Sequence, residues 1–179
     1  MHKSTIQSIT YIISGSLMQL CGAIGGGWVS NLLILIGFVL FFNGLSALKK
    51  GLDAPGQNAV GLLILAAVGG MGAALLGLIP LIGMLASMLF LIVFVVEIIA
   101  YLRLKNSQSI GEKGRSGISL LVTAMALAAL ASLIDLVPFI GGFVGGLLSL
   151  AALLLSLTGW MRIQEGLIDT EGEGPEQTQ

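Results

Sequence analysis

The chain has 179 residues, of which 56% are hydrophobic and only 9% are charged, with a formal net charge of −1. Soluble domains carry about 25% charged residues and cannot cover their surface with so little polarity. The composition therefore excludes a soluble globular domain and predicts an all-α, polytopic integral membrane protein.

Three long intervals of the sequence, 4–48, 54–96 and 116–161, are almost free of charge, with Asp135 as the exception. A helix needs about 20 apolar residues to cross about 30 Å of hydrocarbon, so each interval suits two helices. We therefore expect six transmembrane helices in one domain, 1–166. They would form three tandem helical hairpins, 6–48, 59–102 and 117–161.

Turn signals interrupt each interval near its middle. In the second hairpin Pro80 lacks a backbone donor and Gly83 relaxes the chain after it, which predicts a tight reversal there. Pro138 has the same place in the third hairpin, and a glycine-rich stretch, 22–28, has it in the first. The second helices of the three hairpins have similar ends, each with a basic residue. Either an ancient duplication or the shared requirements of crossing a membrane explains this similarity.

The basic residues predict the orientation of the chain. All eight fall at the amino terminus, in the two longer loops or at the end of the last helix, and none falls in the tight turns: Lys3, Lys49, Lys50, Arg103, Lys105, Lys113, Arg115 and Arg162. By the positive-inside rule, both termini face the cytoplasm of a cell with an inner or plasma membrane. Residues 1–23 also have features of a secretory signal, but removing them would leave five helices and a broken hairpin pattern.

The carboxyl-terminal residues 167–179 are acidic and rich in glycine and threonine. Such a composition predicts a disordered cytoplasmic tail.

Small residues predict where helices approach closely. The sequence GGFVGG offers two pairs with small-xxx-small spacing, and the third helix offers another. The residues are Gly141, Gly142, Gly145, Gly146, Ala73 and Gly77. We expect these faces to close contacts within the bundle, with dimerisation as the alternative.

Glu97 is the one ionisable residue well inside an expected helix. It stands six residues before Arg103, and Asn43 and Ser156 stand six residues before the basic ends of their own helices, so all three should lie at one depth, about 9 Å from those ends. Thr10 and Tyr11 of the first helix reach a similar depth. These residues predict a polar layer in which Glu97 faces the bundle interior, with Tyr101, one turn away, as a suitable partner.

The sequence offers little material for chemistry. His2 is the only histidine and Cys21 the only cysteine. We therefore expect no enzyme, no metal site, no cofactor and no nucleic-acid partner. The favoured function is a structural or assembly subunit that packs in the lipid bilayer against other membrane subunits or a second copy of itself. The alternative is a small channel or transporter that uses the polar layer around Glu97.

Overall fold

The computed structural model describes residues 2–24, 27–77, 83–134, 137 and 141–172. This part of the chain is all-α, as expected. Its six helices are α1 (His2–Ile24), α2 (Gly27–Lys49), α3 (Ala54–Gly77), α4 (Gly83–Leu104), α5 (Glu112–Ile134) and α6 (Gly141–Gly172).

Four of the described helices contain segments long and apolar enough to cross a membrane: Leu32–Lys49, Ala54–Ala73, Glu112–Ile134 and Gly142–Asp169. Each has at least the length of about 18 residues that a membrane helix needs. Several such helices in one chain indicate a membrane protein.

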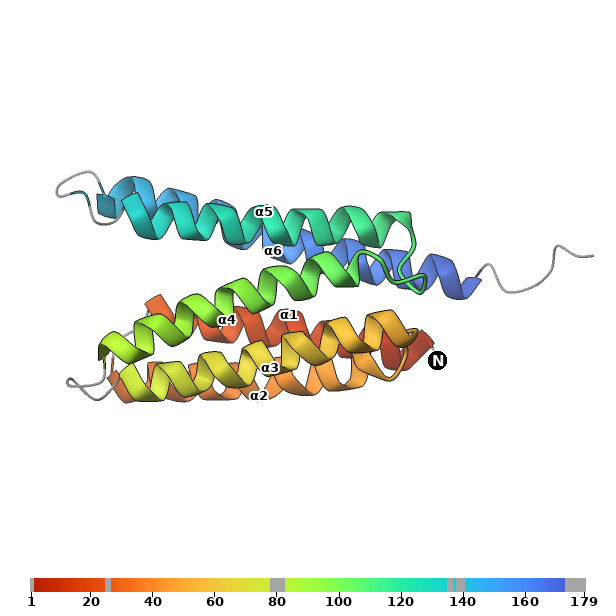
Figure 1. The fold of residues 1–179 in the computed structure, drawn as a ribbon, viewed down its shortest axis with the longest axis horizontal. Helices are drawn as coiled ribbons and strands as arrows, with labels where there is room; N and C mark the ends of the chain where they lie inside the picture. Colours follow the sequence, from red (N-terminus) through yellow and green to blue (C-terminus); the bar gives the residue numbers. More distant parts are fainter. Residues whose placement is uncertain (1, 25–26, 78–82, 135–136, 138–140, 173–179) are drawn as a thin grey trace, which may run out of the picture. The chain divides into compact units, whose positions relative to one another are not determined.

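The chain divides into an N-terminal unit, Met1–Gln108, and a C-terminal unit, Ser109–Gln179. In the N-terminal unit α1 packs along α2 and α3 packs along α4, while α2 and α3 contact each other less extensively. In the C-terminal unit α5 packs along α6. Figure 1 shows that the two helices of each packed pair, α1 with α2, α3 with α4 and α5 with α6, run antiparallel.

Local chemistry accounts for the helix ends that meet the longer loops. Lys49 and Arg103 lie in the last turns of α2 and α4, where a positive charge complements the helix dipole, and Glu112 lies in the first turn of α5. Of the predicted turn residues, Gly83 is the first residue of α4, whereas Pro80 and Pro138 lie outside the described residues.

Helix α6 corrects the expectation of a tail that is disordered from Leu167 onward, because it continues to Gly172. Leu167 is buried, and the Lys113 ammonium lies 3.0 Å from the Asp169 carboxylate. Composition alone does not indicate this extension of the helix. Near its end Gly166 meets the backbone of Gly114 on α5, whereas the ion pair is exposed and adds little stability. Residues 173–179 lie outside the described part of the chain.

Glycines bring the backbones of α1 and α2 into direct contact. A Cβ atom placed on Gly15 would lie 2.6 Å from the carbonyl oxygen of Gly37, and one placed on Gly37 would lie 2.6 Å from that of Gly15. Farther along the same interface, a Cβ on Gly44 would lie 2.6 Å from the carbonyl oxygen of Ser8. No larger residue fits at these positions without separating the helices.

The same arrangement joins α5 and α6. A Cβ on Gly117 would lie 2.5 Å from the carbonyl oxygen of Gly159, and one on Gly159 would lie 2.8 Å from that of Gly117. Gly166 meets the backbone of Gly114 as closely, so the two helices cross tightly along more than one turn. We refer to these contacts, Gly15 with Gly37 and Gly117 with Gly159, as the glycine crossings.

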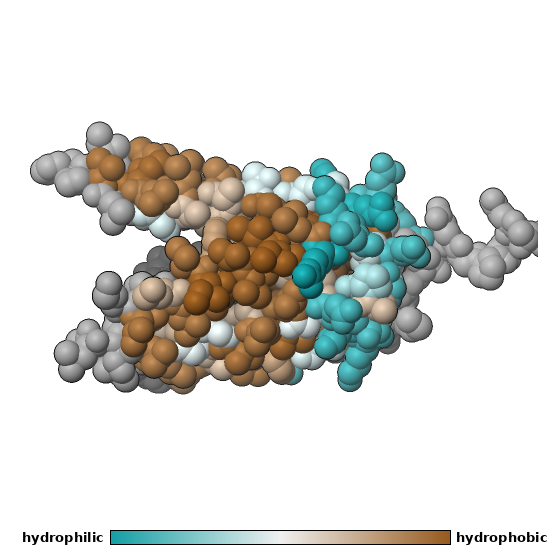
Figure 2. All heavy atoms as spheres, viewed as in Figure 1, coloured by the Kyte–Doolittle hydropathy of each residue, from teal (hydrophilic) through white to brown (hydrophobic). Residues whose placement is uncertain are grey.

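Most of the buried side chains among the described residues lie toward one end of each unit. We call it the loop-bearing end: in the N-terminal unit it is where residues 50–53 join α2 to α3, and in the C-terminal unit it is where α5 begins. In the N-terminal unit the buried side chains come from early α1, late α2, early α3 and late α4, and include Ile12, Leu45, Val60 and Leu104. The hydrophilic residues of this unit cover the same end, where α2 passes into α3, and apolar residues cover most of the rest of the visible face (Figure 2).

We predict that Gly117→Ala destabilises the C-terminal unit by about 1–3 kcal/mol, because the added methyl group meets backbone atoms of α6 that cannot rotate away. Thermal unfolding in detergent, followed by circular dichroism, measures the loss as a lower midpoint. The matched control is Gly146→Ala, where the added Cβ has no described atom within 4 Å. This control should leave the midpoint unchanged or raise it, because alanine favours helix over glycine by about 0.5–1 kcal/mol. Equal effects of the two substitutions would contradict the role of the crossing.

Candidate functional site

Glu97 lies on the face of α4 that packs against α3. Ala100 and Leu104, three and seven residues further on, are fully buried on this face, and Val93, four residues earlier, contacts α3 at Gly69. Glu97 itself is half-buried, and its carboxyl group shares a side-chain hydrogen bond with Tyr101. Tyr101 is only 3% exposed, so the half-buried carboxyl group of Glu97 has a buried partner on its own helix.

The other residues of the expected polar layer have different surroundings. On α1, Tyr11 is 38% exposed and accepts a hydrogen bond of 3.0 Å from the Gln7 amide, while the Thr10 hydroxyl donates to the carbonyl of Ile6 in its own helix. Asn43 on α2 is exposed. Ser156 is half-buried in the C-terminal unit. The contact that links two side chains around Glu97 is therefore the one with Tyr101, and the wider layer stays a prediction.

Some of the predicted helix-packing residues are buried and others are exposed. Ala73 is fully buried in the N-terminal unit and Gly145 is buried in the C-terminal unit. Gly142 and Gly146 are exposed and have no described atom near an added Cβ. The surroundings of Gly141 and Gly77 lie outside the described part of the structure.

A polar cluster that sequence reasoning missed lies at the loop-bearing end of the N-terminal unit. Asp53 caps α3, since its Oδ1 atom accepts a hydrogen bond of 3.2 Å from the backbone of Gly56. The same carboxylate accepts a hydrogen bond from the hydroxyl of Ser107 and one of 2.8 Å from the backbone of Gln108. It therefore ties the start of α3 to the segment that follows α4.

The surroundings of this Asp53 cluster are closely packed. Ser107 is fully buried and Leu52, beside Asp53, is 5% exposed. A Cβ on Gly56 would lie 2.7 Å from the Ser107 hydroxyl and 2.8 Å from Asp53, so glycine is needed there. The sequence signal was the Asp-Ala-Pro-Gly stretch, which resembles an N-cap followed by a helix start. The link to Ser107, 54 residues away, has no local signal.

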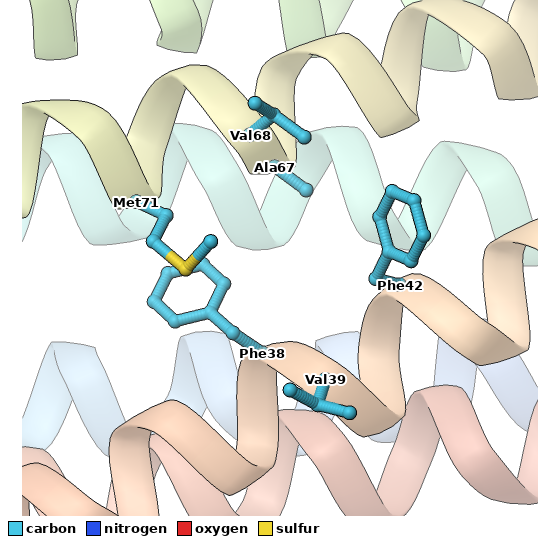
Figure 3. A pocket seen from close by; sticks show the side chains of 6 residues that line it. All are labelled: Phe38, Val39, Phe42, Ala67, Val68 and Met71. Carbon is cyan, nitrogen blue, oxygen red and sulfur yellow. The ribbon is translucent and has the colours of Figure 1, made fainter.

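An apolar groove of about 290 Å³ lies between α2 and α3 in the N-terminal unit. Figure 3 shows the side chains that line it, three from each helix: Phe38, Val39, Phe42, Ala67, Val68 and Met71. Such a lining suits hydrocarbon and supplies no group that could orient a polar ligand.

The described residues contain no group of three or more histidine, cysteine, aspartate or glutamate side chains that could hold a metal ion. In comparisons with known proteins, no protein-family model, no curated protein and no solved structure matches the chain.

We predict that Asp53→Ala lowers the free energy of unfolding by about 2–3 kcal/mol, because it removes both the α3 cap and the link to Ser107 and Gln108. Asp53→Asn is the matched variant: its side-chain oxygen can keep the bonds from Gly56 and Ser107, but the amide nitrogen that replaces Oδ2 cannot accept the bond from Gln108. It should cost about half as much. Denaturant unfolding in mild detergent measures both, and a harmless Asp53→Ala would show that the cluster does not hold the two segments together.

Proposed function

We propose that the chain is an integral protein of an inner or plasma membrane, that all six helices cross the bilayer as three hairpins, and that both termini face the cytoplasm. The consecutive pairing of the helices supports this proposal. So does the distribution of charge, because the basic residues lie near the chain termini and the longer loops, several of them in the adjoining helix turns, and the positive-inside rule places such residues on the cytoplasmic side.

Within the membrane, we propose a structural or assembly role in which the protein packs against a helix of another membrane protein. The observation that carries this proposal is an apolar stripe on α4, formed by six exposed residues spaced alternately three and four apart: Leu85, Met88, Ile92, Val95, Ile99 and Leu102. This is the spacing by which one helix presents a continuous seam to another helix. The stripe lies on the side of α4 opposite Ala100 and Leu104, which are buried.

The second candidate, a small channel or transporter, is favoured by the Glu97–Tyr101 pair. A carboxyl group in a membrane helix is expensive and commonly marks an ion or proton path. Here the carboxyl group has a buried hydrogen-bonding partner on its own helix, which also suits a purely structural role.

The proposed topology predicts opposite accessibility for two positions. A cysteine in place of Gly111, between α4 and α5, should react with a membrane-impermeant thiol reagent only after the cells are opened. A cysteine in place of Gly26 should react in intact cells. Both variants carry Cys21→Ser so that the native thiol does not contribute. Reaction of both positions from the same side would exclude six crossings.

The assembly role predicts a protein neighbour at the α4 stripe. A photo-crosslinking residue at Ile92 in the full-length chain, activated in the native membrane, should yield a discrete crosslinked protein that also co-purifies in gentle detergent. The same residue at Ala100, on the buried face of α4, should not capture that protein. Capture of lipid alone, or of the chain's own α5 or α6, would contradict the proposal.

The transport alternative predicts a different result. The purified protein alone, reconstituted in vesicles, would then move protons or cations, and Glu97→Gln would abolish this flux while leaving the thermal unfolding midpoint within a few degrees. Glutamine keeps the shape and the hydrogen bond to Tyr101 but cannot titrate. Absence of flux, with a partner captured at Ile92, would leave Glu97 as a packing group.

A further inference from the structure

Asn43 is placed on an outward, otherwise apolar face of α2. The preceding members of this face are Val29, Leu32, Ile36 and Val39, which are between 45% and 59% exposed. Asn43 is also exposed, and the five positions are spaced alternately three and four residues apart. We call this surface the α2 seam. It points away from the face of α2 that meets α1, which contains Gly37 and Gly44, and its member Val39 also borders the groove between α2 and α3.

The hydroxyl groups of the described helices show how a polar side chain is accommodated in such surroundings. Five exposed hydroxyls of the described helices donate to the carbonyl group one turn earlier in their own helix: Thr10 to Ile6, Ser119 to Arg115, Thr123 to Ser119, Ser132 to Ala128, and Thr158 to Leu154. A hydroxyl needs only one such bond to satisfy its donor. Each of these groups is therefore compatible with lipid without help from another helix.

An asparagine amide differs because it carries two N–H donors and a carbonyl acceptor. The structure gives the Asn43 side chain no hydrogen bond to another described residue, and its segment, Leu32–Lys49, is one of those able to cross a membrane. Asn43 lies six residues before Lys49, about 9 Å along the helix axis, which is too far for its short side chain to reach the headgroups. In hydrocarbon, an amide in this position needs a partner.

We propose that a second copy of the chain packs on the α2 seam, with the two α2 helices parallel and the Asn43 amides hydrogen-bonded to each other. This inference rests on the proposed crossing of the membrane by α2. Two copies inserted in the same orientation place Asn43 at the same depth. The Nδ2 group of each amide can then donate to the Oδ1 atom of the other across a two-fold axis.

The spacing of the α2 seam and the presence of one asparagine in it both support a second copy as the partner. Alternation of three and four residues is the repeat of two helices that pack at a small angle, and a single asparagine in such a seam fixes register and the number of chains. A different protein would need its own amide or hydroxyl at this depth, whereas a second copy supplies it automatically. The α2 seam is separate from the α4 stripe, so both surfaces can be occupied at once.

The test uses the full-length chain in lipid vesicles, with the native thiol removed as Cys21→Ser. Single cysteines at Ile36 and Val39 should form disulfide-linked dimers on mild oxidation. The matched control is Leu65→Cys on α3, which is equally exposed (61%, against 59% for Val39) and lies at a comparable distance from the loop-bearing end of its helix. This control should remain monomeric.

The role of the amide is tested in the same vesicles by energy transfer between labelled copies. Asn43→Leu should weaken self-association about 3- to 30-fold, as expected for one interhelical amide contact, and Asn43→Gln should retain most of it. The thermal unfolding midpoint of the monomer in detergent should be unchanged, because Asn43 is exposed.

Three results would overturn the inference. The first is equal crosslinking at Val39 and Leu65, and the second is the absence of any dimer. The third is a lowered monomer midpoint for Asn43→Leu with unchanged self-association, which would place Asn43 in the interior polar layer. None of these results concerns the α4 stripe, and capture of a partner at Ile92 would leave the assembly role intact.

Discussion

The close approach of helix backbones at the glycine crossings is the constraint on which the rest of the structure depends. In lipid, burying apolar surface between helices provides no hydrophobic drive, so dispersion contacts and backbone proximity must hold the helices together. Gly15 and Gly37 provide this for α1 and α2, and Gly117 and Gly159 provide it for α5 and α6. Once two antiparallel helices touch at such a point, their rotation is fixed, and with it the side of each helix on which every other residue lies.

Helices α3 and α4 are not held together by a glycine crossing of this kind. Gly69 approaches only the side chain of Val93, at 2.9 Å from an added Cβ, rather than a facing backbone. This pair is closed instead at its loop-bearing end, where the Asp53 carboxylate joins the start of α3 to the segment after α4. A charged group can serve there because the end of the unit is polar (Figure 2), whereas the same group in mid-membrane would be costly.

Much of the fold could be predicted from the sequence, because composition and the spacing of charges report directly on solvent and helix length. The all-α class and the existence of several helices able to cross a membrane follow from these features. The end of α6 could not be predicted, because the contacts of Gly166 with Gly114 and of Asp169 with Lys113 depend on a helix that lies far away in the sequence.

The packing glycines show the same limit more clearly. A search for small residues four apart selects the stretch from Gly141 to Gly146, yet Gly142 and Gly146 face open space. The glycines that do cross, such as Gly15 and Gly117, have a large residue four positions away on either side. Whether a glycine closes a contact depends on the register of the facing helix, which no local motif contains. In the same way, the depth of a polar residue along its helix does not predict whether that residue faces the interior or the outer surface.

Asn43 and Glu97 illustrate this last point, because each stands six residues before the basic residue in the last turn of its helix. Glu97 shares a face with Ala100 and Leu104 and finds Tyr101 inside the unit, whereas Asn43 lies on a face that α1 does not cover. The rotation set by Gly37 and Gly44 turns Asn43 outward, so two polar residues at similar depth meet different needs. A unit that satisfies its inward carboxyl group on its own helix but leaves an amide on its outer surface fits the proposal that this protein acts by assembling within the membrane.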